Sequence, residues 1–285
     1  MTEKAPPMLG ETKFIGQILL DTAKITAPDA ERVLSLQRQS GIRFGEAALK
    51  LNLISEDDLQ FALSRQFSYS YLRANLGEYG SELIAAYAPF AEQVEELRAV
   101  RSHLVLRWFN DQNRALAIVS AESGAGRSYL AANLAVVFSQ LGERTLLIDA
   151  DFRSSYQHKI FKTSNDRGLS IWLSGRGESL EVISVPHFSN LKVLSAGPKP
   201  PNPQELLCGS RFNNLLTELQ QSFDVILIDT PPCERYTDAE IISSRVGGAL
   251  FVSHKNKTRL NSAKATVDKL QNAGAVVVGS VLNTF

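Results

Sequence analysis

The stretch AIVSAESGAGRSYLAANLA, residues 117–135, contains most of a phosphate-binding loop. The usual signature is G-x-x-x-x-G-K-[ST], in which backbone amides and the lysine surround phosphate oxygens. Gly126 and Ser128 fit this signature, whereas Ala121 replaces the first glycine and Arg127 replaces the lysine. An arginine keeps the positive charge and offers a planar fork of donors, but it is bulkier than lysine. We therefore expect nucleotide binding to survive this change more readily than fast phosphoryl transfer.

Carboxylates follow two apolar segments further along the chain. LLIDADFR places Asp149, Asp151 and Arg153 directly after one segment, and VILIDTPP places Asp229 at the end of another. A carboxylate at the end of a buried strand is costly unless it is solvated, paired or bound to a cation. Mg²⁺ prefers hard oxygen ligands together with substrate phosphates. These three carboxylates and the Ser128 hydroxyl therefore suggest a Mg²⁺ site beside the loop.

Strand-like segments alternate with helical patterns from Arg114 onward. The loop is followed by a helical pattern to Leu141 with Gly142 as its stop, and another pattern lies between Thr258 and Ala273. Strands that are apolar on both faces imply a mostly parallel sheet covered by helices, with ligands at the carboxyl ends of the strands. We therefore expect an α/β, P-loop NTPase-like fold. Its predicted strands are 116–120, 145–151, 191–197, 223–232, 248–253 and 275–283.

The first seventy residues contain an internal repeat. Residues 14–37 align with residues 43–66, with seven identities in 24 positions. Each unit has a short helix after its glycine, then a [ST]-x-x-D start, at Thr26 and at Ser55, that can cap a second amphipathic helix. The repeat predicts a small, mainly helical domain.

The composition and the positions of glycine and proline indicate two domains. The 285 residues are 44% hydrophobic, and 30 basic residues balance 30 acidic ones, which gives no global preference for nucleic acid. No apolar run approaches the roughly 18 residues of a membrane span, so we expect a cytoplasmic chain. Glycines and a proline interrupt the pattern before residue 90. We expect a helical regulatory domain at 1–70, a tyrosine-rich linker at 71–90 and an ATP-binding domain at 91–285.

The order of the loop, LLIDADFR and LIDTPP resembles that of the bacterial tyrosine kinases that govern polysaccharide chain length. PPNPQELL (200–207) and GSVLN (279–283) are similar to further signatures of this family, and the resemblance covers about residues 88–285. It implies that ATP is held by Ser123, Gly124, Ala125, Gly126, Arg127, Ser128 and Tyr129. The metal ligands that it implies are Ser128, Asp151 and Asp229. The catalytic residues are Arg127, Asp149, Asp151 and Arg153, with Asp149 helping to activate a tyrosine hydroxyl.

The resemblance also implies partners. Glu95, Arg98 and Arg101 match a helix motif that builds a ring of subunits in this family, although such a pattern is often only a solvated helix face. The family works with a membrane-embedded polysaccharide co-polymerase as activator, which would recruit this chain to the inner face of the membrane. The family's C-terminal tyrosine cluster is absent, since no tyrosine follows Tyr236. A linker tyrosine or another protein could accept phosphate instead, or phosphorylation could be vestigial.

The repeat is similar to the two tandem 24-residue motifs in the N-terminal domain of type II secretion and pilus ATPases, the MshE N-terminal-like domain. Its fusion to the kinase-like region resembles the EpsG-type exopolysaccharide variant. Some members of the domain family bind cyclic di-GMP. Here that ligand would contact Gly16, Gln37, Arg43, Gly45 and Gln66, although Phe14 stands where the first motif should have an arginine. A protein-docking module is the alternative.

Two other classes stay open for the nucleotide-binding region. A partitioning ATPase of the same fold has a second lysine five residues before the loop lysine, and Glu122 occupies that position here. A non-catalytic assembly module, in which nucleotide binding controls ring formation, is favoured by Arg127 and by the missing C-terminal tyrosines. The acidic trio disfavours it, and an ATP turnover assay separates it from a kinase.

Overall fold

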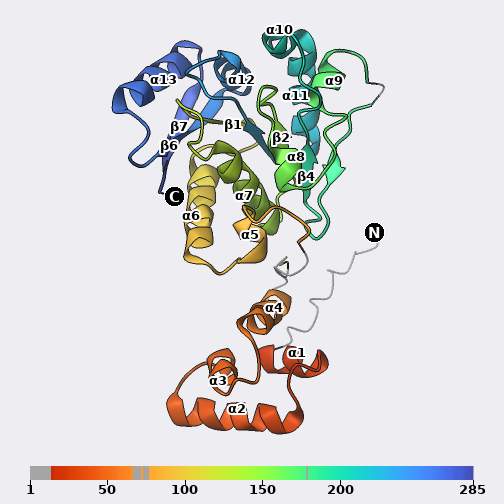
Figure 1. The fold of residues 1–285 in the computed structure, drawn as a ribbon, viewed down its shortest axis with the longest axis vertical. Coiled ribbons are helices and arrows are strands. Elements are labelled where there is room, and N and C mark those ends of the chain that lie inside the picture. The colour runs from red at the N-terminus through yellow and green to blue at the C-terminus, as the bar shows by residue number, and fades with distance from the viewer. Residues whose placement is uncertain (1–13, 67–71, 73–76, 178, 285) are drawn as a thin grey trace, which may run out of the picture. The chain divides into compact units, whose positions relative to one another are not determined.

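The computed structural model describes residues 14–66, 72, 77–177 and 179–284 (Figure 1). The chain divides into two compact units, Met1–Asn75 and Leu76–Phe285. Residues 77–90, which we expected in a linker, belong to the second unit. There the short helix α5 (Ile84–Tyr87) packs on α7 (Arg127–Gln140). The expected tyrosines Tyr69 and Tyr71 lie outside the described residues.

The described part of the first unit consists of four helices, as the repeat predicts: α1 (Ile15–Asp21), α2 (Ala27–Ser40), α3 (Phe44–Lys50) and α4 (Glu56–Gln66). The expected caps are confirmed. The Asp29 N–H donates to Thr26 Oγ1 at 3.4 Å, and the Asp58 N–H donates to Ser55 Oγ at 3.2 Å. In return, each aspartate accepts the backbone N–H of its capping residue. Each second helix therefore begins with its end amides satisfied.

The two repeat glycines lie inside the short helices rather than before them. A Cβ on Gly16 would lie 3.2 Å from the Phe44 ring, and a Cβ on Gly45 would lie 2.4 Å from Leu59 Cδ1. The bare backbone of each glycine is therefore covered by a side chain of the same unit. Close helix packing accounts for glycine at both positions.

The second unit is built on a seven-stranded sheet, in the order β3-β4-β2-β5-β1-β6-β7. All neighbouring strands are parallel except the β3–β4 pair. Strands β1, β2 and β5 are buried along their whole length, as a sheet covered on both faces requires. The predicted fold class is confirmed. The strands are β1 (Ala115–Val119), β2 (Thr145–Asp149), β3 (Ile183–Ser184), β4 (Leu191–Leu194), β5 (Val225–Asp229), β6 (Gly248–His254) and β7 (Val276–Asn283).

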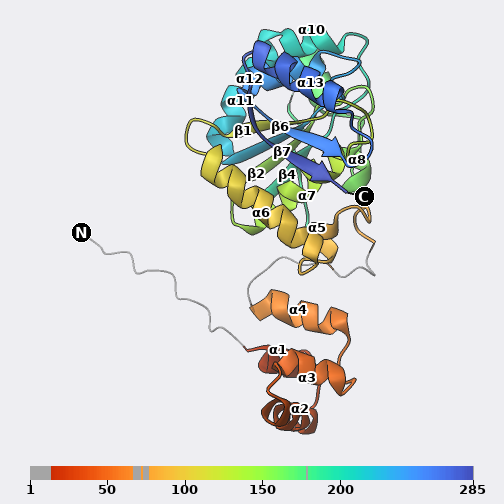
Figure 2. The same ribbon diagram turned by 90° about the vertical axis from the view of Figure 1, so that its left-hand side faces the viewer.

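Helices cover both faces of this sheet (Figure 2). On one face lie α6 (Glu92–Arg107) and α7, and on the other lie α11 (Ser210–Ser222), α12 (Asp238–Val246) and α13 (Leu260–Asn272). Among the described residues, no helix is long and apolar enough to cross a membrane. The remaining helices are α8 (Gln157–Ile160), α9 (Leu169–Leu173) and α10 (Pro203–Cys208).

The segment 79–87 is fixed to α7 by the buried side chain of Asn133. Its Oδ1 accepts the Ala85 N–H at 2.9 Å, and its Nδ2 donates to the Glu82 carbonyl at 2.9 Å. The Tyr87 hydroxyl donates to the Tyr79 carbonyl, and the Tyr79 hydroxyl donates to the Pro186 carbonyl. Burial raises the pKa of Tyr79 to about 12. We call residues 79–87 the strap.

Candidate functional site

The loop between β1 and α7 has the backbone of a phosphate cradle. Gly124 and Gly126 have φ angles of +76° and +93°, a conformation that L side chains rarely adopt. Gly126 is the N-cap of α7, whose first-turn amides and positive end therefore face the loop. The sequence places glycine at the two positions where the turn requires it.

A cavity of about 620 Å³ lies over this loop. Most of the loop residues that we expected to bind nucleotide line it, and so do Asp151 and Arg153. Glu82 from the strap and Tyr156 also line it. The full lining is Glu82, Ser123, Gly124, Gly126, Arg127, Ser128, Tyr129, Asp151, Arg153, Ser154, Tyr156, Ile160, Lys199, Pro232, Arg235 and Tyr236.

The Arg127 guanidinium is buried and largely engaged by the protein. Its Nε donates to the Thr230 carbonyl at 2.8 Å. Its Nη1 donates to the Glu122 carbonyl at 3.0 Å and to the Ser120 hydroxyl. Its Nη2 lies 4.0 Å from Asp151 Oδ2. Several of the five N–H donors of the fork are therefore used behind the loop, although the side chain still lines the cavity.

Asp149 is fully buried, and both of its carboxylate oxygens accept backbone amides. Oδ1 accepts the Asp151 N–H at 3.1 Å, and Oδ2 accepts the N–H groups of Tyr156 and Gln157, each at 3.0 Å. Burial raises the pKa of Asp149 well above its usual value, repulsion from Asp229 adds to this, and the amide hydrogen bonds oppose it. Asp149 is not among the described residues that line the cavity, so its contacts hold the 151–157 loop in place.

Asp229 is the neighbour of Asp149 on the adjacent strand β5. Its Oδ2 accepts the Gln157 Nε2–H at 2.8 Å. Its Oδ1 is buried and has no hydrogen-bond partner among the described residues. Burial raises the pKa of Asp229, while the Arg127 guanidinium and the Ser128 hydroxyl oppose that rise.

Asp151 and Arg153 lie on the cavity wall after β2. Asp151 Oδ1 accepts the N–H groups of Arg153 at 3.1 Å and Ser154 at 2.9 Å, so Oδ2 faces Arg127. The Arg153 guanidinium binds both oxygens of the buried Asp238, at 2.9 and 3.1 Å, and lies 3.6 Å from the centre of the Tyr236 ring. Arg153 therefore presents a fixed cation to the cavity.

The residues fit a Mg²⁺ ion that is shared with a nucleotide. Within the described ranges, no group of three or more His, Cys, Asp or Glu side chains could hold a metal ion. Mg²⁺ at nucleotide sites uses one or two carboxylates and completes its shell with phosphates and water. The unpaired Asp229 Oδ1 is an orphaned acceptor beside Ser128, as such a site requires. Ser128 and Asp151 line the cavity above it.

Sequence reasoning missed four contributors to the site. Gln157 bridges Asp229 and the loop helix, and the Tyr156 hydroxyl donates to Glu82 Oε1 at 2.8 Å on the cavity wall. Asn283 Nδ2 donates to the Ala125 carbonyl at 3.1 Å, which ties the last strand to the loop. Only Asn283 carried a sequence signal, as the last residue of GSVLN.

The residues expected to bind cyclic di-GMP occupy different environments in the first unit. Arg43 is exposed at the N-cap of α3, whereas Gly45 is buried at the second position of the same helix. Gly16, Gln37 and Gln66 are half-buried, and Gln66 Oε1 has no hydrogen-bond partner among the described residues.

The motif expected at a subunit interface lies on α6. Arg98 binds Glu95 and donates to the Pro89 carbonyl at 2.6 Å, and Arg101 donates to the Val137 carbonyl at 2.8 Å. Both arginines therefore hold α6 to its own chain. The Glu95 side chain is 64% exposed, so it is the charge of the motif that faces outward.

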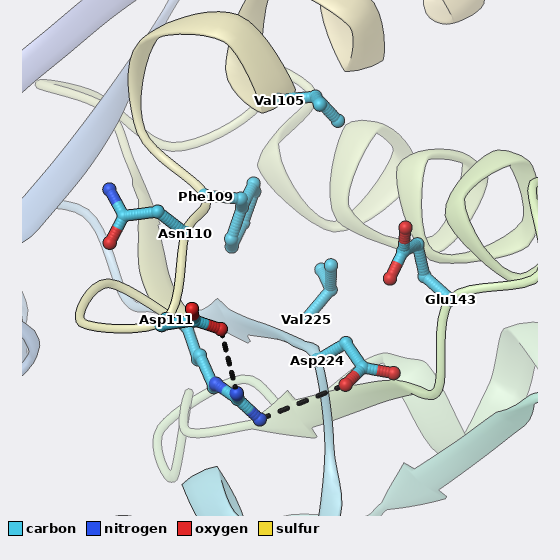
Figure 3. Close-up of a pocket in the computed structure, with 8 residues that line it drawn as sticks. Val105, Phe109, Asn110, Asp111, Glu143, Asp224 and Val225 are labelled. Atoms are coloured by element: carbon cyan, nitrogen blue, oxygen red, sulfur yellow. Dashed lines mark hydrogen bonds and ion pairs between the residues drawn. The ribbon is translucent and has the colours of Figure 1, made fainter.

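Another cavity, of about 330 Å³, lies at the opposite edge of the sheet (Figure 3). It is lined by Arg114 and Asp224, which precede β1 and β5, and by the end of α6. Arg114 lies 3.3 Å from Asp111 and 3.7 Å from Asp224, so the charged groups there pair with one another. Ligands of parallel sheets lie at the carboxyl ends of strands, so we place the candidate site at the loop.

Comparisons with known proteins agree with this geometry. The model of the family described as ParA, the NUBPL iron-transfer P-loop NTPases, matches residues 111–284. The tyrosine-protein kinase CapB of Staphylococcus aureus is 38% identical over 189 residues, which are 66% of this chain and 83% of CapB. The kinase domain of the Escherichia coli tyrosine kinase ETK has a TM-score of 0.67 and 29% identity, over 75% of this chain and 84% of that domain.

A longer relative shows how much of such proteins this chain represents. The tyrosine-protein kinase wzc of Salmonella typhi is 35% identical over 205 residues, which are 72% of this chain but only 28% of wzc. The chain belongs to the bacterial tyrosine-protein kinase family, within the ParA-type P-loop NTPases.

Proposed function

We propose that this chain is an ATP-dependent protein-tyrosine autokinase that regulates exopolysaccharide chain length and export. The observation that carries the proposal is one cavity of about 620 Å³ in which the phosphate loop, Ser128, Arg127 and Asp151 meet. The unpaired oxygen of Asp229 lies at the end of the strand beside it. The similar proteins CapB and wzc are named tyrosine-protein kinases.

In this proposal the chain acts mainly by positioning and by neutralising charge. The loop amides and the positive end of α7 bind phosphate oxygens, and Arg127 adds the part of its fork that remains available. Ser128 and Asp229 hold Mg²⁺, which when bound neutralises phosphate charge. Asp151 carries the cavity carboxylate that meets the incoming tyrosine hydroxyl or the metal. Asp149 supports it by fixing the 151–157 loop.

The candidates for the phosphate acceptor within this chain are its seven tyrosines. The Tyr87 hydroxyl donates to the Tyr79 carbonyl within the strap, and the buried Tyr79 donates its hydroxyl to the Pro186 carbonyl. The cavity itself is lined by three tyrosines. An experiment that locates phosphotyrosine in the chain must therefore cover all seven tyrosines: Tyr69, Tyr71, Tyr79, Tyr87, Tyr129, Tyr156 and Tyr236.

The deciding experiment incubates purified chain with Mg²⁺ and γ-labelled ATP, alone and with a cytoplasmic fragment of a membrane-embedded polysaccharide co-polymerase. Asp151→Asn is the matched control, because it keeps the side-chain volume and removes the charge. We expect phosphotyrosine in the wild type that the control lacks. Nucleotide binding without phosphotyrosine or released phosphate, in both samples, would refute the kinase proposal.

That negative result would identify the second candidate function, a non-catalytic assembly module gated by nucleotide. One observation favours it. Several N–H groups of Arg127 donate to Thr230, Glu122 and Ser120 behind the loop, so fewer of them remain for phosphate. Under this candidate, nucleotide changes the mass of the assembly and is not consumed. Light scattering with ADP and with a non-hydrolysable ATP analogue measures that change.

We further propose that the chain is of the EpsG-type exopolysaccharide variant, and that its first unit is an MshE N-terminal-like regulatory module. It would act in the cytoplasm at the inner membrane face, as a ring-like homo-oligomer beside its co-polymerase. Cyclic di-GMP would bind the first unit through Arg43, which is exposed, because Gly16 and Gly45 are already covered. Calorimetry with cyclic di-GMP on wild type and Arg43→Ala tests this. Equal binding of cyclic di-GMP to wild type and Arg43→Ala, or no binding to either, would support the alternative that the first unit is a protein-docking module.

A further inference from the structure

Three parts of the site meet at the side chain and backbone of Gln157, which is fully buried. Its backbone N–H donates to Asp149 Oδ2 at 3.0 Å. Its side-chain Nε2 donates to Asp229 Oδ2 at 2.8 Å and to the Ser128 carbonyl at 3.1 Å. One residue thus joins the ends of β2 and β5 to the first turn of α7.

The chemistry of these partners fixes the orientation of the amide. Both side-chain partners are acceptors, so only the NH₂ group of Gln157 can bridge them, and the reverse orientation would set three acceptors against one another. Asp229 Oδ2 is consequently occupied, and rotation of that carboxylate would break the 2.8 Å hydrogen bond. The Asp229 oxygen that stays unpaired among the described residues is Oδ1.

A purely packing role does not explain this glutamine. Its Oε1 is buried and has no hydrogen-bond partner among the described residues. A buried unpaired acceptor costs free energy, whereas an apolar side chain of the same volume would fill the space without that cost. The two N–H bonds that Nε2 makes are what an apolar side chain could not supply.

We infer that Gln157 is a positioning residue that holds the Asp229 carboxylate with Oδ1 turned to Mg²⁺ and ties it to the loop helix at Ser128. The inference rests on the Mg²⁺-nucleotide site of the proposed function, and on none of its phosphoryl-transfer steps. Partners that orient a metal ligand in this way are typically worth 10–100-fold in metal affinity.

The test measures Mg²⁺-dependent nucleotide binding rather than kinase activity. A fluorescent ADP analogue is titrated into the full chain in EDTA and again at increasing Mg²⁺ concentrations. Gln157→Met keeps a similar volume and removes both donors, and Gln157→Asn keeps the amide but shortens its reach. Gln220→Met is the matched control, since Gln220 is half-buried near the end of α11 and precedes β5, at the end of the sheet opposite the site.

We expect both Gln157 variants to bind the analogue in EDTA within about 2-fold of wild type, and to need about 10-fold or more Mg²⁺ for half-maximal enhancement. The Gln220→Met control should match wild type in both conditions. Equal Mg²⁺ dependence in wild type and both variants would overturn the inference. So would a proportional loss of affinity with and without Mg²⁺, which indicates general disruption of the site.

Folding is checked by thermal melting of each variant, and the Asn variant carries the test if the Met variant does not fold. The outcome is separable from that of the proposed function. A wild type that binds nucleotide with Mg²⁺ but forms no phosphotyrosine refutes the kinase and still supports this inference if the variants lose their Mg²⁺ dependence.

Discussion

The guanidinium of Arg127 shows how one substitution changes the use of a phosphate loop. A lysine would bring a single ammonium that is free to lie between phosphates, whereas Arg127 is fixed by carbonyls of Thr230 and Glu122 and by the Ser120 hydroxyl. The positive charge stays beside Asp151. We infer that the arginine supports the loop structurally as much as it binds the ligand.

Two substitutions separate these roles. Arg127→Lys should keep affinity for ADP within about 3-fold and raise phosphotyrosine formation about 10-fold, which corresponds to about 1.4 kcal/mol in the barrier. Arg127→Ala leaves two carbonyls and a hydroxyl without their donor, so it should lower the free energy of unfolding by about 1–3 kcal/mol. Urea denaturation and labelled-ATP assays measure the two effects. A lysine variant no faster than wild type would show that the arginine does not limit transfer.

The acidic residues of the site could be located from the sequence, because each follows an apolar strand and parallel strands end at one edge. The separate roles of these residues could not be predicted from the sequence. Asp149 and Asp151 are two residues apart in one motif, yet only Asp151 lines the cavity among the described residues. Gln157 lies in a four-residue helix with no periodicity to read. Its role depends on the Asp229 carboxylate, 72 positions away.

At the scale of elements, the strand ends opposite the site are joined by an ion pair. Arg144, before β2, donates to Asp224, before β5, at 2.9 and 2.6 Å. These hydrogen bonds hold the pKa of Asp224 below its usual value. A lowered pKa in the folded state stabilises the fold above the unfolded pKa of about 3.9, and this stability is lost as pH falls through the folded pKa.

Asp224→Asn should therefore lower the urea midpoint slightly at pH 6, and its difference from wild type should shrink as the pH falls below the unfolded pKa of about 3.9. The effect is small because the Arg144 side chain is 53% exposed. Urea unfolding at a series of pH values, with the exposed Asp268→Asn as control, measures it. A difference that persists unchanged at pH 2.5 would contradict the assignment of the stability to this pair.

The elements themselves were predicted unevenly. The helix after the loop ends at Gln140 with Gly142 at φ +101°, one residue from the expected end. The segment 223–232 was expected as strand, but β5 covers only Val225–Asp229, because Thr230 and the prolines turn away toward the loop. Strand β3 has two residues and no sequence signal. The strap was expected as linker, since its anchor, Asn133, is remote in sequence.

At the scale of the whole chain, the strap is the segment of the second unit that precedes α6 and supplies Glu82 to the cavity wall. Asn133→Ala leaves the Ala85 N–H and the Glu82 carbonyl without their partner. Hydrogen exchange of residues 80–87 should rise about 10-fold or more, as about 1.4 kcal/mol of local stability is lost. Affinity for nucleotide should fall modestly. Exchange unchanged from that of the exposed control Asn214→Ala would show that the strap is held by other contacts.

The proposed oligomer is tested through the outward-facing charge of α6. Arg98 and Arg101 are bonded to Pro89 and Val137 of their own chain, so their removal would confound assembly with stability. Glu95 is 64% exposed, so its reversal changes the charge that a second copy would meet, and a thermal melt checks the cost of losing its ion pair with Arg98. Glu95→Lys should shift the mass measured by light scattering toward the monomer. Glu218→Lys, the same charge change on α11, should not. Equal masses for both variants and wild type would place the interface, if the chain assembles, on another face of the second unit.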